Sequence, residues 1–141
     1  MMAKPRFSEE ILATLHKDRI IGIRAGSDSD HRIIGVWVVI VKGRIFVRSY
    51  TMKQGGWWRT FLEDPYGEIF VSKRKRGIKV RAVQTKSEKI KDLVSAAYKE
   101  KYNTRGSVGY VEEMSRKPLR DTTTELVLIN SSRKRDQDAI R

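Results

Sequence analysis

The sequence predicts a single α+β domain that is mainly β, with its strands curled into a barrel. The clearest observation is a hairpin in which two runs of β-branched and aromatic residues, 36–41 and 44–50, flank Lys42 and Gly43. The first run is apolar on both faces, which an open antiparallel sheet with one wet side does not tolerate. Strands and helices also do not alternate regularly, which argues against a doubly wound parallel sheet.

The elements before this hairpin are a short helix and a strand. Ser8 can cap a helix that runs to about His16, because two glutamates follow at the positive end of the helix dipole. Residues 19–25 show the alternation of a strand, and a polar turn at residues 26–30 follows it. A second strand then starts near Arg32 and leads into the hairpin.

The elements after the hairpin are a short helix, a second hairpin, a long helix and a closing strand. Gly55-Gly56 opens the short helix, and Asp64-Pro65 ends its helical spacing of aromatic residues. Ser87 caps the long helix, whose apolar stripe includes Tyr98 and which ends near Tyr102. No pattern assigns a structure to residues 107–118. The second hairpin is expected over residues 68–73 and 78–84, and the closing strand over residues 122–129.

Length and composition indicate one soluble domain. The chain has 141 residues, of which 39% are hydrophobic, enough for one core. We expect one domain over residues 1–131 and a basic, disordered tail over residues 132–141. No apolar run approaches the roughly 18 residues of a membrane span, and the first residues carry no apolar signal region, so we expect a cytoplasmic protein with no membrane span.

The charge balance predicts an anionic partner. Thirty Lys and Arg residues against seventeen Asp and Glu residues give a formal net charge of +13. Nucleic acid, an anionic membrane surface and a phosphorylated small molecule all satisfy this sign, and a solubilising surface is an equally common reason for high charge.

Catalytic and metal-binding side chains are scarce. The chain has no cysteine, which excludes disulfides, thiolate metal sites and cysteine nucleophiles. Asp28, Asp30 and His31 match no metal-binding loop of known spacing, and His16 has no companion. Gly26-Ser27 lacks the strand-to-helix context of a nucleophilic serine, and phosphate-binding glycine fingerprints are absent. We therefore expect no catalytic side chain and no metal site.

A basic, aromatic and glycine-rich block, residues 48–59, lies where a barrel strand runs into a helix. Arginine can hold a phosphate with two hydrogen bonds, and tryptophan or tyrosine can lie against a flat heterocycle. The block thus predicts a site for an anionic heterocycle. The residues alone support equally well a second interpretation, in which Trp57, Trp58 and Phe61 belong to the core and the arginines to a solvated face.

Three motifs carry a family resemblance: the Val-Arg-Ser-Tyr strand end at residues 47–50, the Gly-Gly step before Trp57, and the Asp-Pro that ends the short helix. From Ile34 to about Tyr102, the chain resembles a bacterial domain-of-unknown-function family (2255). That family in turn resembles the FMN-binding split barrels, including pyridoxamine-phosphate-oxidase-like proteins and deazaflavin-dependent nitroreductases. The resemblance implies a six-stranded split barrel with three helices, commonly a homodimer with flavin sites at the subunit interface.

The resemblance also implies a cofactor, FMN or a deazaflavin, and activity as a small oxidoreductase. In such proteins the cofactor performs the electron or hydride transfer, so no catalytic side chain is required. Arg48 and Ser49 match the strand-end residues that hold the flavin phosphate, and Lys53 is the next candidate. The expected cofactor-binding residues are Arg48, Ser49, Tyr50, Lys53, Trp57, Trp58 and Arg59.

The alternative function is nucleic-acid binding by the second hairpin, with no enzymatic activity. Its tip is rich in basic residues that a barrel can present to a phosphate backbone. Only Phe70 is adjacent, so no stacking platform is evident, and a charged hairpin tip that resists aggregation explains the same pattern. The candidate residues are Lys73, Arg74, Lys75, Arg76, Lys79 and Arg81.

Overall fold

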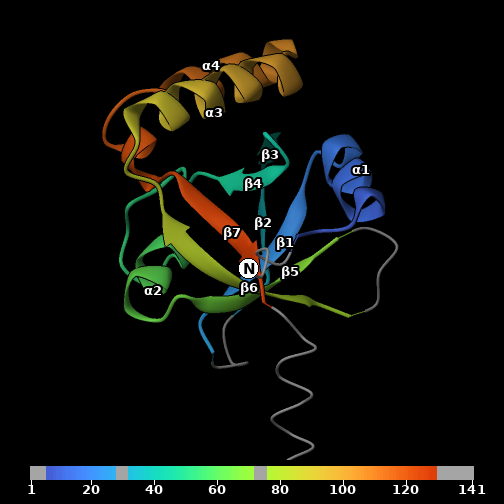
Figure 1. Cartoon of the computed structure of the whole chain (residues 1–141). Helices are drawn as coiled ribbons and strands as arrows, with labels where there is room; N and C mark the ends of the chain where they lie inside the picture. Colours follow the sequence, from blue (N-terminus) through green and yellow to red (C-terminus); the bar gives the residue numbers. More distant parts are fainter. Residues whose placement is uncertain (1–5, 28–31, 72–75, 130–141) are drawn as a thin grey trace, which may run out of the picture.

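The computed structural model describes residues 6–27, 32–71 and 76–129, which form seven strands, four α-helices and one 3-10 turn (Figure 1). None of these helices is long and apolar enough to cross a membrane. In chain order the elements are α1 (Glu9–Lys17), β1 (Ile21–Ala25), β2 (Ile34–Val36), β3 (Val38–Val41), β4 (Arg44–Val47), α2 (Trp57–Glu63), β5 (Tyr66–Phe70), β6 (Ile78–Gln84), α3 (Glu88–Lys101), α4 (Arg105–Met114), η1 (Leu119–Thr122) and β7 (Thr124–Leu128).

The strands form one antiparallel sheet, in the order β2-β1-β5-β6-β7-β4-β3, which closes almost completely into a barrel. β2 and β3 lie at the two edges of this sheet, yet only Trp37 separates them in sequence. The same stretch of chain therefore pairs with β1 at one edge and with β4 at the other. The expectation of six strands is wrong by one, because the chain changes partner at Trp37 and one extended run becomes two strands.

Alternation along β3 and β4 sends side chains into two separate cores. Val38 and Val47 point into the barrel, where they join its central cluster. Val39 and Phe46 point outward and pack with residues of α3 and α4. Both faces of β3 are thus covered, one by the barrel and one by helices, as its apolar sequence predicts.

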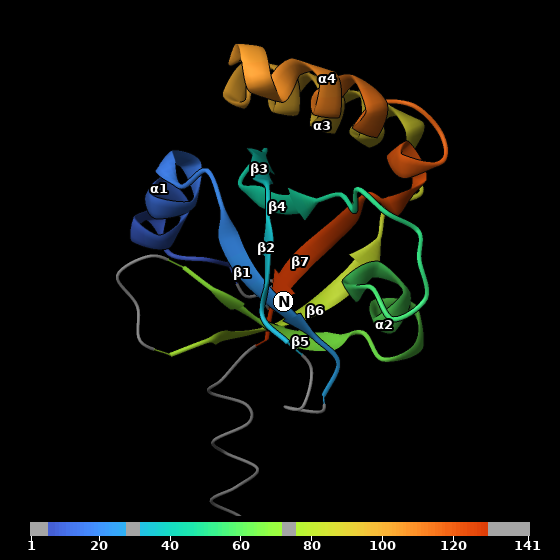
Figure 2. The same cartoon turned by 180° about the vertical axis from the view of Figure 1, so that it is seen from behind.

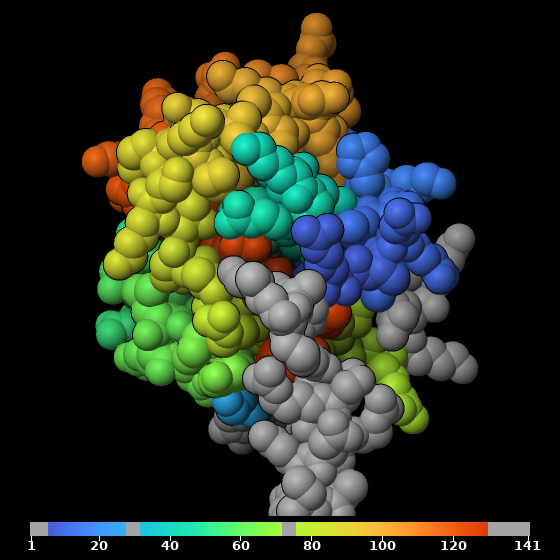
Figure 3. Space-filling view, in the orientation of Figure 1, coloured from blue at the N-terminus to red at the C-terminus, as the bar shows by residue number. Residues whose placement is uncertain are grey.

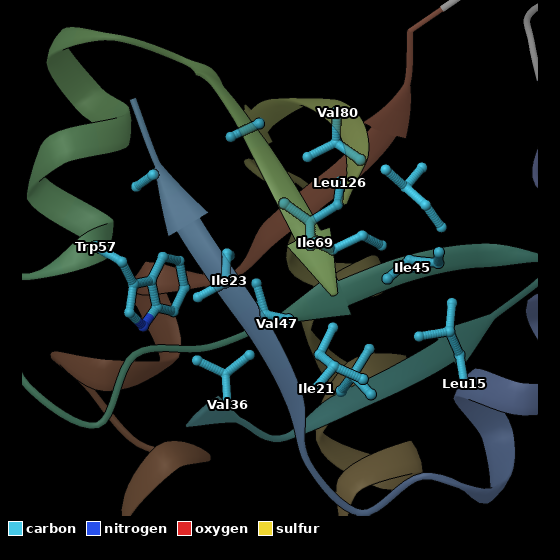
Figure 4. Close-up of a cluster of buried hydrophobic side chains, with 14 of the residues drawn as sticks. Leu15, Ile21, Ile23, Val36, Ile45, Val47, Trp57, Ile69, Val80 and Leu126 are labelled. Atoms are coloured by element: carbon cyan, nitrogen blue, oxygen red, sulfur yellow. The ribbon is translucent and has the colours of Figure 1, made fainter. Parts of the chain in front are cut away.

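Two further helices close opposite ends of the barrel core. Figure 4 shows Leu15 of α1 at one end of the labelled side chains and Trp57 of α2 at the other. Phe61 of α2 packs over Gly67 of β5, where an added Cβ would meet the Phe61 ring and the carbonyl oxygen of Arg24. A glycine is therefore required for α2 to approach the sheet this closely.

Helices α3 and α4 lie side by side over the outer face of the β3–β4 hairpin (Figures 1 and 2). The space-filling view shows this hairpin between α3 and α1 (Figure 3). The Tyr102 hydroxyl, just after α3, accepts a hydrogen bond of 3.0 Å from the backbone N–H of Val38. The Lys101 ammonium donates to the carbonyl oxygens of Leu15 and Val38, both at 2.8 Å. These groups satisfy the backbone N–H and carbonyl of Val38 in β3, and Lys101 also joins α3 to α1.

The local signals at caps and turns are confirmed. The hydroxyls of Ser8 and Ser87 each accept a hydrogen bond from a backbone N–H in the first turn of their helix. Lys42 and Gly43 have φ values of 54° and 74°, and two positive φ values are the signature of a type I′ hairpin turn.

The fourth helix, α4, covers most of residues 107–118, for which the sequence pattern predicts no structure, so the expectation of three helices is one too few. Gly106 and Gly109 lower the intrinsic helix propensity of this segment. Packing of Val111 and Met114 against the outer core compensates for it. The tail expected at residues 132–141 lies outside the described residues.

Candidate functional site

The candidate site begins where the β3–β4 hairpin opens into a fork. Backbone pairing runs from Val41 opposite Arg44 to Val38 opposite Val47. Beyond that last pair the two chains separate. One continues through Trp37 into β2, which pairs with β1, and the other continues as a loop to α2.

A cavity of about 590 Å³ lies in this fork, within the size range of small-molecule sites. Its walls come from β2, from the loop between β4 and α2, and from α4. The lining residues are Arg32, Ile34, Gly35, Val36 and Trp37 on the first side, Arg48, Ser49, Tyr50, Thr51, Lys53, Gly55, Gly56 and Trp57 on the second, and Tyr110 and Met114 of α4.

Four aromatic rings line the cavity: Trp37, Tyr50, Trp57 and Tyr110. Tyr110 meets Tyr50 edge to face, with ring centroids 5.1 Å apart, and meets Trp37 in the same way at 6.1 Å. Trp37 in turn stacks on Tyr102 at 4.4 Å. Rings that brace one another in this way offer fixed apolar surface to a flat conjugated ligand.

The charged lining residues are all cationic. Arg32 and Lys53 are exposed, whereas Arg48 is buried. Among the residues that the structure describes, no carboxylate lines the cavity. Its electrostatic potential therefore favours an anionic ligand.

Arg48 is 2% exposed, and its guanidinium is bound within the protein. Its Nε donates to Thr123 Oγ1 at 2.7 Å, and one terminal nitrogen donates to Ser95 Oγ at 2.8 Å and to the Met114 carbonyl at 2.9 Å. The other terminal nitrogen donates to the Lys91 carbonyl at 2.8 Å. Burial lowers the pKa of Arg48 to about 10. Four of the five N–H groups of this guanidinium are thus used within the protein, three of them on α3 and α4.

Ser49 and Tyr50 also have partners within the chain. The Ser49 hydroxyl donates to the Thr51 carbonyl oxygen and accepts a hydrogen bond from the Thr51 backbone N–H. The Tyr50 hydroxyl donates to Glu113 Oε1 at 2.8 Å, and this hydrogen bond raises the pKa of Tyr50. The Tyr50 ring nevertheless remains 45% exposed and lines the cavity.

The fold therefore brings five of the seven predicted site residues to one cavity: Arg48, Ser49, Tyr50, Lys53 and Trp57. Trp58 and Arg59 do not line it. Trp58 Nε1 donates to Gln84 Oε1 at 2.8 Å, and Arg59 Nε donates to the Met52 carbonyl at 2.9 Å.

The second interpretation of the block is correct for Trp57 and Phe61, and Trp58 is partly buried against the same core. For the arginines it is correct at Arg59, which is exposed, and wrong at Arg48, which is buried. Trp57 and Phe61 are 9% and 2% exposed and belong to the barrel core. Trp57 has both roles, because one part of its surface packs in the core and another lines the cavity.

Tyr98 of α3 is fully buried at the base of the fork. Its hydroxyl accepts a hydrogen bond of 3.0 Å from the backbone N–H of Arg48 and donates one of 2.8 Å to the carbonyl oxygen of Trp37. Burial raises the pKa of Tyr98, so the hydroxyl keeps the proton that it donates. One side-chain oxygen thus bridges the two arms of the fork.

The sequence prediction missed Arg32 and all three residues of β2, and it missed Trp37, Tyr110 and Met114 of the lining and Tyr98 behind it. Trp37 and Tyr98 were assigned to apolar runs, whose periodicity indicates burial but gives no sign of a cavity. Tyr110 and Met114 lie in the segment without a structural assignment. Aromatic residues on a short glycine-containing segment are the signal that could have directed attention to Tyr110.

The basic hairpin is described only in part. Arg76 just before β6, and Lys79 and Arg81 on alternate positions of β6, are exposed, while Lys73, Arg74 and Lys75 lie outside the described residues. Nucleic-acid binding there stays a prediction. Asp28, Asp30 and His31 also lie outside the described residues, so the expectation that they hold no metal stays a prediction. In the described part of the chain, no group of three His, Asp or Glu residues could hold a metal ion.

Three solved structures with a similar fold are the conserved hypothetical protein Rv2991 from Mycobacterium tuberculosis, the heme storage protein HutZ from Vibrio cholerae and an FAD-binding protein from Mesorhizobium loti. Rv2991 is 16% identical with a TM-score of 0.59, covering 91% of this chain and 83% of its own. HutZ is 11% identical with a TM-score of 0.62, and the match covers 89% of this chain and 92% of HutZ. The FAD-binding protein is 10% identical with a TM-score of 0.54, and the match covers 92% of this chain and 95% of that protein. At these identities the likeness shows the fold alone, which is a split barrel.

The sequence comparisons give one family match. The family described as "Uncharacterized protein conserved in bacteria (DUF2255)" matches residues 13–126. Comparison with curated proteins gives no match.

Proposed function

This chain belongs to the bacterial DUF2255 family, and on that premise we propose that its fork cavity binds a planar, anionic cofactor of the flavin class, FMN or a deazaflavin. The observation that carries the proposal is the combination of four aromatic rings and three cationic side chains around one cavity of about 590 Å³. A flavin needs an apolar slot for its ring system and positive charge for its phosphate, and both are present.

The aromatic part of the cavity fits the ring system. Tyr110, Tyr50 and Trp37 hold one another edge to face, and Trp57 is fixed by its packing in the barrel core. Rigid side chains lose little conformational entropy when a ligand binds, so such a surface is pre-organised.

The cationic residues best placed for the phosphate differ from the pair, Arg48 and Ser49, that the resemblance implies. Because the guanidinium of Arg48 already makes four internal hydrogen bonds, the exposed ammonium of Lys53 and the exposed guanidinium of Arg32 are better placed to meet a phosphate. We assign Lys53 as the principal phosphate contact. Arg48 supplies positive charge to the wall and fixes its shape.

A bound flavin would supply the electron or hydride transfer. The chain's own residues would bind and orient it, with the rings as side walls and Lys53 at the charged end. Of the proteins with this fold, one is described as FAD-binding and HutZ as a heme storage protein. The flavin ring system and heme are both planar and conjugated, and both cofactors are anionic. This supports the class of ligand that we propose.

The direct test is a fluorescence titration with FMN, and with a deazaflavin, on the wild type and two variants. Lys53→Ala should weaken binding about tenfold, since a charge-assisted hydrogen bond contributes about 1.5 kcal/mol. Lys89→Ala is the matched control, because it removes the same charge from an exposed position on α3.

Equal affinities of the two variants would remove Lys53 from the site. A wild type that binds neither cofactor would refute the proposed function.

A further inference from the structure

The pairing of the β3–β4 hairpin defines which bond should come next in its ladder. In a two-residue turn the flanking residues, Val41 and Arg44, form a hydrogen-bonded pair. Hydrogen-bonded and non-hydrogen-bonded pairs alternate along an antiparallel ladder. Val38 and Val47 are therefore a non-hydrogen-bonded pair, and the next hydrogen-bonded pair would join the N–H of Arg48 to the carbonyl oxygen of Trp37.

These two groups are the partners of the Tyr98 hydroxyl. The N–H of Arg48 donates to Tyr98 Oη at 3.0 Å, and Tyr98 Oη donates to the Trp37 oxygen at 2.8 Å. The hydroxyl thus stands between the two halves of a ladder bond, satisfies both of them, and keeps the two strands apart.

We propose that Tyr98 is a positioning residue: its hydroxyl is inserted into the ladder and holds open the fork in which the cavity lies. Trp37 and Arg48, the two residues it separates, both line that cavity. The shape of the cavity therefore depends on a side chain that is not part of its lining.

The side chain of Arg48, whose backbone N–H binds the Tyr98 hydroxyl, helps to fix the position of that hydroxyl. The Arg48 guanidinium bonds to Ser95 Oγ and to the Lys91 carbonyl, both on α3, the helix that carries Tyr98. The Tyr98 ring is fully buried in the outer core. Strand and helix are thus tied together at the point where the hydroxyl enters the ladder.

The test compares Tyr98→Phe with Tyr102→Phe. Each variant removes one buried hydroxyl that bonds to the backbone of this hairpin, but only Tyr98 stands inside a ladder bond. NMR scalar coupling across hydrogen bonds identifies the acceptor of the Arg48 N–H directly. We expect no coupling from the Arg48 nitrogen to the Trp37 carbonyl carbon in the wild type or in Tyr102→Phe, and a measurable coupling in Tyr98→Phe.

A coupling in the wild type, or none in Tyr98→Phe because water replaces the hydroxyl, would overturn the proposal. If Tyr98→Phe does not fold, the wild type still decides. Its Tyr98 hydroxyl proton should exchange slowly and show a nuclear Overhauser effect to the Arg48 amide proton, and absence of both signals would contradict the insertion.

The consequence for ligand binding rests on the proposed function. With FMN as the probe, Tyr98→Phe should bind about tenfold more weakly than Tyr102→Phe, which keeps the ring that stacks on Trp37. If the wild type does not bind FMN or a deazaflavin, the proposed function fails and the NMR result still decides the role of Tyr98. If the wild type binds and Tyr98→Phe binds equally well, the cavity does not depend on this hydroxyl.

Discussion

Arg48 shows that the role of a charged residue depends on where its side chain goes. The split-barrel resemblance implies a phosphate contact at this strand end. In the folded chain the Arg48 side chain crosses instead to the outer core and bonds to Thr123, Ser95 and two carbonyl oxygens. Sequence alone does not tell an arginine that binds a ligand from one that joins two layers, because both follow the same local pattern.

Replacing Arg48 should therefore affect folding stability strongly. Arg48→Ala leaves several buried acceptors without a donor, and we expect a loss of about 3 kcal/mol or more in the free energy of unfolding. Arg59→Ala, at an exposed arginine with one bond to a loop carbonyl, should cost less than about 1 kcal/mol. Urea denaturation of the two variants measures both values, and similar losses would contradict the structural role of Arg48.

The elements themselves were largely predictable. The type I′ turn, the two serine caps and the end of the long helix each have a local cause in one or two residues. The division of one run into β2 and β3 has no local cause, because it follows from pairing with β1 and β4, which are distant in sequence. The site was predicted only in part, because the pattern of residues 48–59 indicates its loop, whereas β2 and α4 reach the site only through tertiary packing.

Two glycines offer a test of how the elements pack. Gly67→Ala should destabilise the fold by about 2 kcal/mol or more, since its Cβ would overlap the Arg24 carbonyl and the Phe61 ring. Gly109→Ala, in α4, meets no atom within 4 Å and should stabilise the protein by about 0.5–1 kcal/mol through helix propensity. Thermal unfolding of both variants compares them directly, and changes of the same sign would contradict the packing described for α2 or for α4.

At the scale of the whole molecule, exposed apolar side chains gather at the cavity. Ile34, Tyr50 and Tyr110 line it and remain 42%, 45% and 50% exposed. Exposed apolar groups of this kind mark interaction sites on soluble domains. A second copy of the chain is the partner that the split-barrel resemblance implies.

We accordingly expect a homodimer in solution. Ile34→Glu places a charge in this patch and should shift the protein toward the monomer, whereas Leu62→Glu, at an exposed leucine on α2, should not. Light scattering coupled to size exclusion measures the mass of each variant. A wild-type monomer, or a dimer unaffected by Ile34→Glu, would exclude this surface as the interface.

The most direct test of the central claim, that the fork cavity holds a flavin-class cofactor, is one spectrum. Purified protein is mixed with FMN or a deazaflavin, freed of unbound cofactor, and measured from about 300 to 550 nm, with Lys53→Ala in parallel. We expect a retained band, shifted from that of the free cofactor and reduced in the variant. Protein that retains neither cofactor would contradict the claim.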